Sequence, residues 1–285
     1  MPSLLISVRA LADWLDGPET PETPVLLDCR SDLADPTAGR RAWAAGHIGQ
    51  AHFADLAQDL SDPTGPAAAG RHPLPQPAAF ANTLRSWGID RHRQVVVYDH
   101  GPGALAARAW WLLRQCGINV QLLDGGLQAW QAAGGELRTG APCSPPEVEA
   151  LNVEFAGWLD NADLADNLGQ GRCVLIDARE AARYRGEIEP IDPIAGHIPG
   201  ACNRPFAENL DAQGRFLPAG ELRAAFEALL GEAATEPHRV VHQCGSGVTA
   251  CHNLLAMEIA GLRGSRLHAP SWSGWIAEGR PVARD

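Results

Sequence analysis

A cysteine followed by a glycine-rich turn is the strongest chemical signal in this sequence. Cys244 comes just after a predicted buried strand, Val240–His242, and is followed by Gly-Ser-Gly-Val-Thr before a stretch of helical length. Glycines allow successive backbone N–H groups to turn toward one point, and the positive end of the helix dipole lies at the same place. Both effects stabilise a negatively charged sulfur, so the pattern predicts a nucleophilic thiolate at Cys244.

The same backbone groups would also stabilise a persulfide, a sulfur chain on the cysteine that ends in negative charge. The residues expected to supply these amides follow the cysteine directly: Gly245, Ser246, Gly247, Val248 and Thr249. The hydroxyl of Thr249 could either cap the start of the helix or donate a hydrogen bond to the sulfur. The loop is therefore expected to bind the reacting sulfur as well as to activate it.

Two other uses of such a cysteine are tested by residue spacing. Phosphatases with a Cys-x5-Arg loop need an arginine six residues after the cysteine, and that position is Ala250. A metal site could combine Cys244 with His242 and His252, but no second Cys-x-x-Cys or His-x-x-x-His pattern supplies the remaining ligands. The sequence therefore favours sulfur chemistry with neither a metal nor another cofactor.

The chain around this loop carries one pattern twice. Its 285 residues are close to twice the roughly 150 residues of one ordinary domain. The segment 25–30, Val-Leu-Leu-Asp-Cys-Arg, is similar to 174–179, and the segment 46–51, Gly-His-Ile-Gly-Gln-Ala, is similar to 196–201. Two later blocks, near residues 96 and 130, recur near residues 240 and 275 at almost the same offset. The repeat predicts one fold that is present twice.

Short β-branched runs alternate with longer stretches of helical spacing in each copy. Strands are expected at Val25–Leu27, Val95–Tyr98, Val120–Leu123, Cys173–Ile176, Val240–His242 and Arg266–His268. Helices are expected at Pro77–Trp87, Ala104–Cys116, Glu221–Leu230 and Val248–Ala260. This alternation predicts two tandem α/β domains, each a parallel sheet covered by helices on both faces. Residues 1–140 and 153–285 would form the two domains, and 141–152 a proline-rich linker.

Composition and charge exclude several classes of function. The 23 Lys and Arg against 34 Asp and Glu leave a net charge of −11, which argues against a nucleic-acid surface. No apolar run reaches the ~18–20 residues of a membrane span, and the first residues have no signal-peptide pattern. Seven cysteines without regular spacing are typical of free thiols in the cytoplasm. An anionic substrate would therefore need local positive groups.

These motifs together resemble the two-domain rhodanese family of sulfurtransferases. Two tandem copies with Asp-x-Arg and Gly-His-Ile blocks, and an active cysteine loop in the second copy alone, carry the resemblance from about Leu4 to Val282. In the first copy, His100 is expected to stand where Cys244 stands in the second. The resemblance implies that Cys244 takes a sulfane sulfur from a small anionic donor, becomes a persulfide, and passes the sulfur to cyanide or a thiol.

The resemblance leaves the donor open between 3-mercaptopyruvate and thiosulfate. The cysteine loop resembles that of the 3-mercaptopyruvate branch, because the thiosulfate branch has basic residues at the positions of Gly245 and Ser246. The 3-mercaptopyruvate branch, however, has an arginine in a Glu-Pro-Arg motif, and this sequence reads Glu189-Pro-Ile191. The loop and the arginine pattern thus point to different donors.

The resemblance also implies roles for residues outside the loop. Arg183 is at the position of the family's anion-binding arginine, and Arg185 would add positive charge nearby. In the 3-mercaptopyruvate branch, a serine, a histidine and an aspartate form a proton relay that protonates the pyruvate enolate. The residues expected here for that relay are Ser246, His47 and Asp35, and His72 is a further candidate for substrate binding.

Several other residues have a structural interpretation. Arg30 and Arg179 follow aspartates at strand ends and are expected to hold loops through salt bridges. His197, in the second Gly-His-Ile block, is expected to bond a turn carbonyl. A rival function shares the fold: a sulfur carrier or regulatory module that loads one sulfur per chain and then stops. The sequence leaves open the donor, the acceptor and the oligomeric state.

Overall fold

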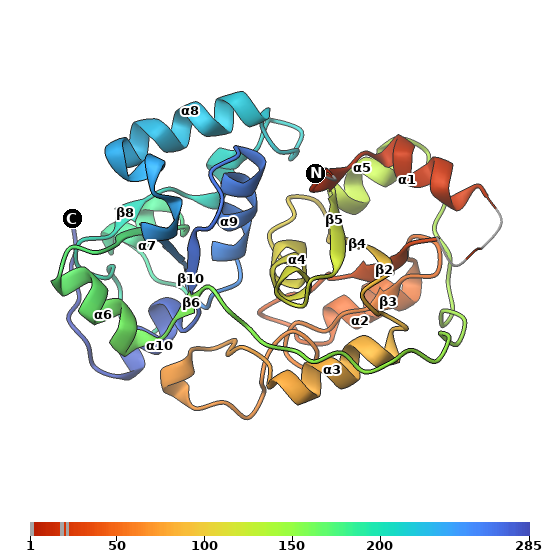
Figure 1. Ribbon diagram of the computed structural model, residues 1–285, viewed down its shortest axis with the longest axis horizontal. Helices are drawn as coiled ribbons and strands as arrows, with labels where there is room; N and C mark the ends of the chain where they lie inside the picture. The colour runs from red at the N-terminus through yellow and green to blue at the C-terminus, as the bar shows by residue number, and fades with distance from the viewer. Residues whose placement is uncertain (1–2, 18–19, 21–22) are drawn as a thin grey trace. The chain divides into compact units, whose positions relative to one another are not determined.

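The computed structural model describes residues 3–17, 20 and 23–285, which divide into two compact units (Figure 1). Unit 1 comprises Met1–Asp62, Pro75–Ala156 and Ala212–Arg215. Unit 2 comprises Pro63–Leu74, Gly157–Asp211 and Phe216–Asp285. The Pro63–Leu74 segment therefore belongs to the first copy by sequence and to unit 2 by packing. The domain boundaries at residues 140 and 153 stay a prediction.

Unit 1 contains a five-stranded, fully parallel sheet in the order β1-β5-β4-β2-β3. Its strands are β1 (Leu5–Ile6), β2 (Val25–Asp28), β3 (His52–Phe53), β4 (Gln94–Tyr98) and β5 (Asn119–Leu123). Its helices are α1 (Val8–Leu15), α2 (Ala38–Ala45), α3 (Pro77–Ser86), α4 (Ala106–Gln115) and α5 (Gly126–Ala132).

Unit 2 repeats this topology with the order β6-β10-β9-β7-β8. Its strands are β6 (Trp158–Leu159), β7 (Val174–Asp177), β8 (Cys202–Asn203), β9 (Val240–Gln243) and β10 (Arg266–His268). Its α-helices are α6 (Asn161–Gly169), α7 (Ala181–Arg185), α8 (Ala219–Leu230), α9 (Ala250–Ile259) and α10 (Ser271–Ala277). Short 3-10 helices are η1 (Ala67–Ala69), η2 (Phe206–Asn209), η3 (Gly231–Thr235) and η4 (Pro237–Arg239). The identical strand order confirms the predicted repeat.

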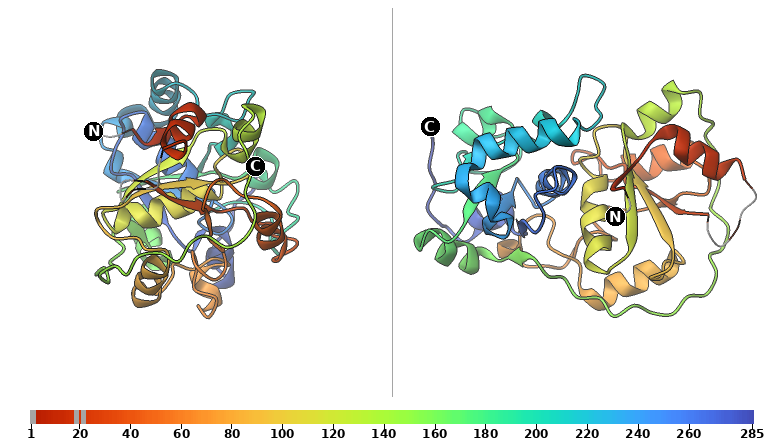
Figure 2. Two further views of the ribbon diagram at one scale, coloured as in Figure 1. Left: turned by 90° about the vertical axis from the view of Figure 1, so that its right-hand side faces the viewer. Right: turned by 45° about the horizontal axis from the view of Figure 1, so that its top comes forward.

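Apolar side chains on both faces of each sheet explain why helices cover both faces. In β4, Val96 and Tyr98 pack on one face with residues of α1 and α5. Val95 and Val97 alternate with them and are also fully buried, which fits the alternation of a strand between two helix layers. Figure 2 shows α1 and α5 on one side of the unit 1 sheet and α3 on the other. The predicted fold class is confirmed.

All six predicted strands and all four predicted helices are present, with ends shifted by at most a few residues. The sequence reasoning missed the outer strands β1, β3, β6 and β8, because two residues are too few for an alternating pattern. Within the described part of the chain, no helix is long and apolar enough to cross a membrane.

Candidate active site

Cys244 lies at the carboxyl end of β9, six residues before α9 begins. Its side chain is buried, and both of its backbone polar groups are fixed by the turn between β10 and α10. The Cys244 N–H donates to the Ser271 hydroxyl at 3.1 Å, and its carbonyl accepts from the Trp272 N–H at 3.0 Å. Ser271 has a positive φ of 53°, a conformation that costs energy for a non-glycine residue. The residue that fixes the Cys244 backbone is thus itself held in a strained conformation.

The loop between Cys244 and α9 leaves backbone donors without acceptors. Gly247 has φ 77°, and a Cβ there would lie 2.5 Å from the Ala269 carbonyl oxygen, so only glycine fits. The amides of Gly245, Ser246, Val248 and Thr249 donate no hydrogen bond to any acceptor among the residues that the structure describes. We call the backbone N–H groups of Gly245, Ser246, Val248 and Thr249 the loop cradle. Free donors at the start of a ten-residue helix are the chemistry of an anion site.

The corresponding loop of the first copy corrects one sequence prediction. Tyr98 pairs with Asp28 in register, as Gln243 does with Asp177, so the next residues, Asp99 and Cys244, are equivalent. The Leu127 N–H donates to the Asp99 carbonyl at 2.9 Å, which repeats the bond that Trp272 makes with Cys244. His100 therefore corresponds to Gly245 and not to Cys244. The correspondence expected from the sequence is one residue off, because the first-copy loop is one residue longer than the second-copy loop.

The side chain of Asp99 shows what such a loop can hold. Its Oδ1 accepts the N–H groups of Gly101 and Gly103, both at 3.0 Å. Its Oδ2 accepts those of Leu105 at 2.9 Å and Ala106 at 3.2 Å. A buried carboxylate is thus bound by four amides of the loop and the helix start. The first copy fills with its own side chain the position at which the second copy presents a sulfur.

The hydroxyl of Ser246 is hydrogen-bonded to a histidine from the first half of the sequence. His72 Nδ1 lies 2.8 Å from Ser246 Oγ, and both side chains are buried in unit 2. The two residues are 174 positions apart, so the tertiary structure alone brings them together. A buried Ser–His pair next to a cysteine can move a proton at the reacting centre.

His72 reaches this place because the Pro63–Leu74 segment is held against α10. Figure 1 shows this orange segment beside α10, and η1 contacts that helix. The backbone N–H of Arg71 donates to the Ser273 hydroxyl at 2.9 Å. A Cβ at Gly70 would lie 2.4 Å from the Pro270 carbonyl oxygen, and a Cβ at Gly274 would lie 2.6 Å from that of Ala68. Two glycines thus allow the backbones to approach this closely.

Arg183, at the end of the short helix α7, lies beside the loop. Its Nη1 and Nη2 are 3.8 and 3.7 Å from the position that a Cβ of Gly245 would occupy. Its Nε and Nη2 donate to the Glu189 carboxylate, and Nη2 is also 3.3 Å from Asp192 Oδ2. Burial opposes the charge of Glu189, but the bonds from Arg183 and from backbone amides outweigh it and lower the pKa of that carboxyl.

Two predicted site residues have other partners. Arg185 is exposed, and its Nε donates to Glu187 at 2.7 Å. Asp35 is exposed in unit 1, where hydrogen bonds from Arg41 and Thr37 hold the pKa of its carboxyl well below the usual range. Neither role that the resemblance implied is tested by these contacts, and both stay predictions.

The two Gly-His-Ile histidines make equivalent contacts. His47 Nε2 is 2.9 Å from the Gly140 carbonyl, and the ring stacks on Trp43 at 5.1 Å. His197 Nδ1 is 2.9 Å from the Tyr184 carbonyl, and its ring stacks on Tyr184 at 3.9 Å. His197 thus bonds a backbone carbonyl as expected, but that carbonyl lies in α7 and not in a turn. His47 makes the same kind of bond in unit 1, and its part in a proton relay stays a prediction.

The Asp-x-Arg blocks hold loops, as predicted. Arg30 binds Asp28 and donates to the Gly46 carbonyl at 2.7 Å, and Arg179 binds Asp177 and donates to the Gly196 carbonyl at 2.8 Å. Burial opposes the charge of Arg179, but Asp177 and Glu189 raise its pKa.

Other thiols in the chain lack the environment of Cys244. Burial raises the pKa of the Cys29 thiol well above its ordinary value and that of Cys116 to about 12. Burial likewise raises the pKa of Cys173. These cysteines stay protonated and act as small apolar side chains. In the described residues, no group of three or more His, Cys, Asp and Glu side chains is arranged to hold a metal ion.

The sequence reasoning missed one residue at the loop, Arg71. Its Nη2 lies 3.4 Å from the position that a Cβ of Gly245 would occupy. No local sequence pattern identifies Arg71 as a site residue, because it lies far from the cysteine loop in the sequence. Its proximity to Gly245 follows from the docking of the Pro63–Leu74 segment on α10.

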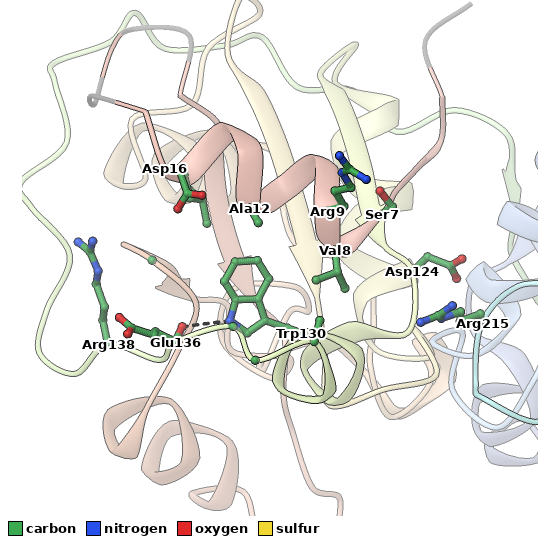
Figure 3. A pocket seen from close by; sticks show the side chains of 15 residues that line it. Ser7, Val8, Arg9, Ala12, Asp16, Asp124, Trp130, Glu136, Arg138 and Arg215 are labelled. Carbon is green, nitrogen blue, oxygen red and sulfur yellow. Dashed lines mark hydrogen bonds between the residues drawn. The ribbon is translucent and has the colours of Figure 1, made fainter.

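A cavity of about 710 Å³ in unit 1 lies apart from the predicted site residues, none of which lines it (Figure 3). Trp130, which lines it, has an equivalent residue in unit 2. Trp275 in unit 2 carries the guanidinium of Arg280 over its ring, at 5.1 Å. In unit 1 the equivalent tryptophan, Trp130, makes the same carbonyl bond six residues on, but Gly135 stands in the place of Arg280. A Cβ at Gly135 would lie 2.3 Å from the Trp130 ring, so the glycine packs directly against the tryptophan.

Comparison with known proteins identifies a family and similar relatives. The chain matches the rhodanese-like domain family twice, over residues 7–133 and 160–278. A Pseudomonas aeruginosa protein named "Probable 3-mercaptopyruvate sulfurtransferase" is 49% identical over 283 residues, with 98% of this chain and 97% of that protein covered. A Mycobacterium tuberculosis protein named as a thiosulfate sulfurtransferase, SseB, is 41% identical over 286 residues, with 99% and 97% covered.

The fold is similar to that of a crystallised relative. The crystal structure of SseA from Escherichia coli, described as a 3-mercaptopyruvate sulfotransferase, superposes with a TM-score of 0.80 and 33% sequence identity. The superposition covers 95% of this chain and 99% of that chain. Family, relatives and fold thus agree over nearly the whole length.

Proposed function

Because the chain belongs to the rhodanese family and is a two-domain sulfurtransferase, we propose that it moves sulfur from 3-mercaptopyruvate to a thiol or cyanide through a persulfide on Cys244. The observation that carries the proposal is the loop cradle, whose four amides donate to no acceptor in the described residues and whose first-copy counterpart binds the Asp99 carboxylate. Such a cradle would stabilise the Cys244 thiolate and its persulfide in turn. The cytoplasmic location stays a prediction.

In the first half-reaction, the Cys244 thiolate attacks the sulfur of 3-mercaptopyruvate. An S–S bond forms, the C–S bond breaks, and its electron pair leaves on carbon as the pyruvate enolate. The enolate needs a proton at that carbon to become pyruvate. The hydrogen-bonded pair of Ser246 and His72 would supply it, since His72 can give its proton through the serine hydroxyl. This pair favours 3-mercaptopyruvate over thiosulfate, whose leaving sulfite carries its electron pair away without protonation.

In the second half-reaction, an acceptor thiolate or cyanide attacks the outer sulfur of the persulfide. The S–S bond breaks, its electron pair returns to Cys244, and the thiolate is restored. The amides of the loop cradle would stabilise the negative charge on Cys244 as it returns. The enzyme therefore alternates between two covalent states and shows ping-pong kinetics.

The test combines one cysteine variant with a matched control. Cys244→Ser should abolish transfer from 3-mercaptopyruvate to cyanide, and intact-protein mass spectrometry should show one added sulfur in the donor-treated wild type but none in the variant. Cys143→Ser, which changes an exposed cysteine, should transfer sulfur like the wild type. Transfer by Cys244→Ser would refute the proposal, and a wild type that loads one sulfur without turnover would instead indicate a carrier.

A further inference from the structure

Two arginines from distant parts of the sequence meet at the first residue of the cysteine loop. Arg71 Nη2 lies 3.4 Å, and Arg183 Nη1 3.8 Å, from the position that a Cβ of Gly245 would occupy. Both belong to unit 2, so their proximity is a property of one compact body. A side chain at position 245 would fill this space, and the glycine leaves it open.

Two buried carboxylates, Asp192 and Glu189, bind the guanidinium groups of these arginines. Arg71 Nη1 is bound by Asp192 Oδ1, and the other oxygen of the same carboxylate lies 3.3 Å from Arg183 Nη2. Glu189 accepts hydrogen bonds from Nε and from the same Nη2 of Arg183. The side chains of Asp192 and Glu189 are each 3% exposed, so these contacts are built into the fold. Their geometry orients the forks before any ligand binds.

The remaining nitrogens face the loop. Arg71 Nη2 and Arg183 Nη1 donate no hydrogen bond to an acceptor in the described residues, and both lie within 4 Å of the position that a Cβ of Gly245 would occupy. Two planar donors at one point match the two oxygens of a carboxylate. The four charges of this cluster cancel, since Arg71 and Arg183 balance Glu189 and Asp192. Recognition here would therefore depend on directed N–H groups and little on net charge.

We propose that Arg71 is the second arginine of the donor site and binds the carboxylate of 3-mercaptopyruvate together with Arg183. The inference rests on the proposed function and deepens it. It also accounts for Ile191, where the resemblance led us to expect an arginine. The guanidinium of Arg71, in the Pro63–Leu74 segment, binds the carboxylate in place of the arginine that is absent at position 191. Asp192 is a positioning residue, because it fixes both guanidinium groups.

Steady-state kinetics of Arg71→Ala test the proposal. Loss of one charge-assisted fork should raise the KM for 3-mercaptopyruvate about 10- to 100-fold and leave kcat within about threefold. Arg71→Lys keeps the charge without the fork and should give an intermediate KM. The control is Arg223→Ala, which removes an exposed arginine of α8 paired with Glu227 and should leave KM unchanged.

A binding measurement separates this inference from the proposed function. In a Cys244→Ser background, calorimetry with pyruvate reports the carboxylate site without any turnover, and Arg71→Ala should weaken that binding by a similar factor. An unchanged KM and an unchanged pyruvate affinity would overturn the role of Arg71 even if the wild type transfers sulfur. Weakened pyruvate binding would support it even if 3-mercaptopyruvate proved a poor donor. The inference would also be contradicted if Arg71→Lys and Arg71→Ala lowered kcat equally and left KM unchanged.

Discussion

The residue that follows the central strand differs in chemistry between the two copies. Asp99 and Cys244 occupy equivalent positions, and the backbone around each is fixed by the same bond from the next helix. Asp99 saturates four amides with its own carboxylate, so its loop has nothing left to offer a ligand. The Cys244 side chain carries no charge when it is protonated. The amides of the loop cradle are therefore available to stabilise a thiolate or a persulfide. At the scale of the residue, activity therefore depends on which atom occupies the anion position.

The bond between Ser246 and His72 leads to a donor-dependent prediction. Ser246→Ala should lower kcat for 3-mercaptopyruvate about 100-fold or more, because the enolate then lacks its proton donor. His72→Asn should have a similar effect. With thiosulfate the same variants should lose less than about threefold, since sulfite leaves without a proton. Parallel measurements of kcat with both donors check this expectation, and equal losses with the two donors would dismiss the relay.

At the scale of the element, the loop and the helix start act as one anion-binding device. Four amides, a glycine with positive φ and the dipole of α9 converge on the end of β9. The Pro63–Leu74 segment adds His72 and Arg71 to this device because it docks on α10. Each part is local in structure, but the parts come from three separate stretches of sequence: 63–74, 240–259 and 271–277.

The equivalence of the two loops predicts that the second cradle accepts a carboxylate. Cys244→Asp should fold with a urea midpoint close to that of the wild type and transfer no sulfur, because the loop amides would bind the new charge. Val241→Asp is the matched control: it buries a carboxylate three residues before Cys244 at a fully buried site and should cost several kcal/mol. Equal destabilisation by the two variants would show that the loop cradle does not stabilise an anion.

At the scale of the whole molecule, buried histidines connect the fold to pH. Burial, with Arg204 nearby, lowers the pKa of His242 to about 3, and burial, with Arg280 nearby, does the same for His268. Both rings are fully buried, His242 against Met257 and His268 on Asn161. They are neutral in the folded chain and gain protons more readily when it unfolds.

This difference predicts a loss of stability in acid. Below the ordinary histidine pKa of about 6.5 the unfolded chain binds more protons, so the free energy of unfolding falls with pH until about 3. Each histidine should cost up to about 2 kcal/mol between pH 6.5 and 5. Urea unfolding from pH 8 to 5 measures the slope. His268→Gln should flatten it, whereas His238→Gln, which changes an exposed histidine, should not. A slope unaffected by His268→Gln would contradict the assignment.

The sequence alone determined the repeat, the α/β architecture and the reactive cysteine, because these depend on local patterns: buried strands, helical spacing and a glycine-rich turn. Only the tertiary structure decided which distant side chains meet that turn. It placed His72 on Ser246 and Arg71 beside Gly245 through a segment that packs with the other copy's unit. It also assigned the position of Cys244 to Asp99, because strand register fixes equivalence where a loop differs in length. Contacts between residues more than a hundred positions apart leave no periodic trace in the chain, so packing and hydrogen-bond geometry are needed to reveal them.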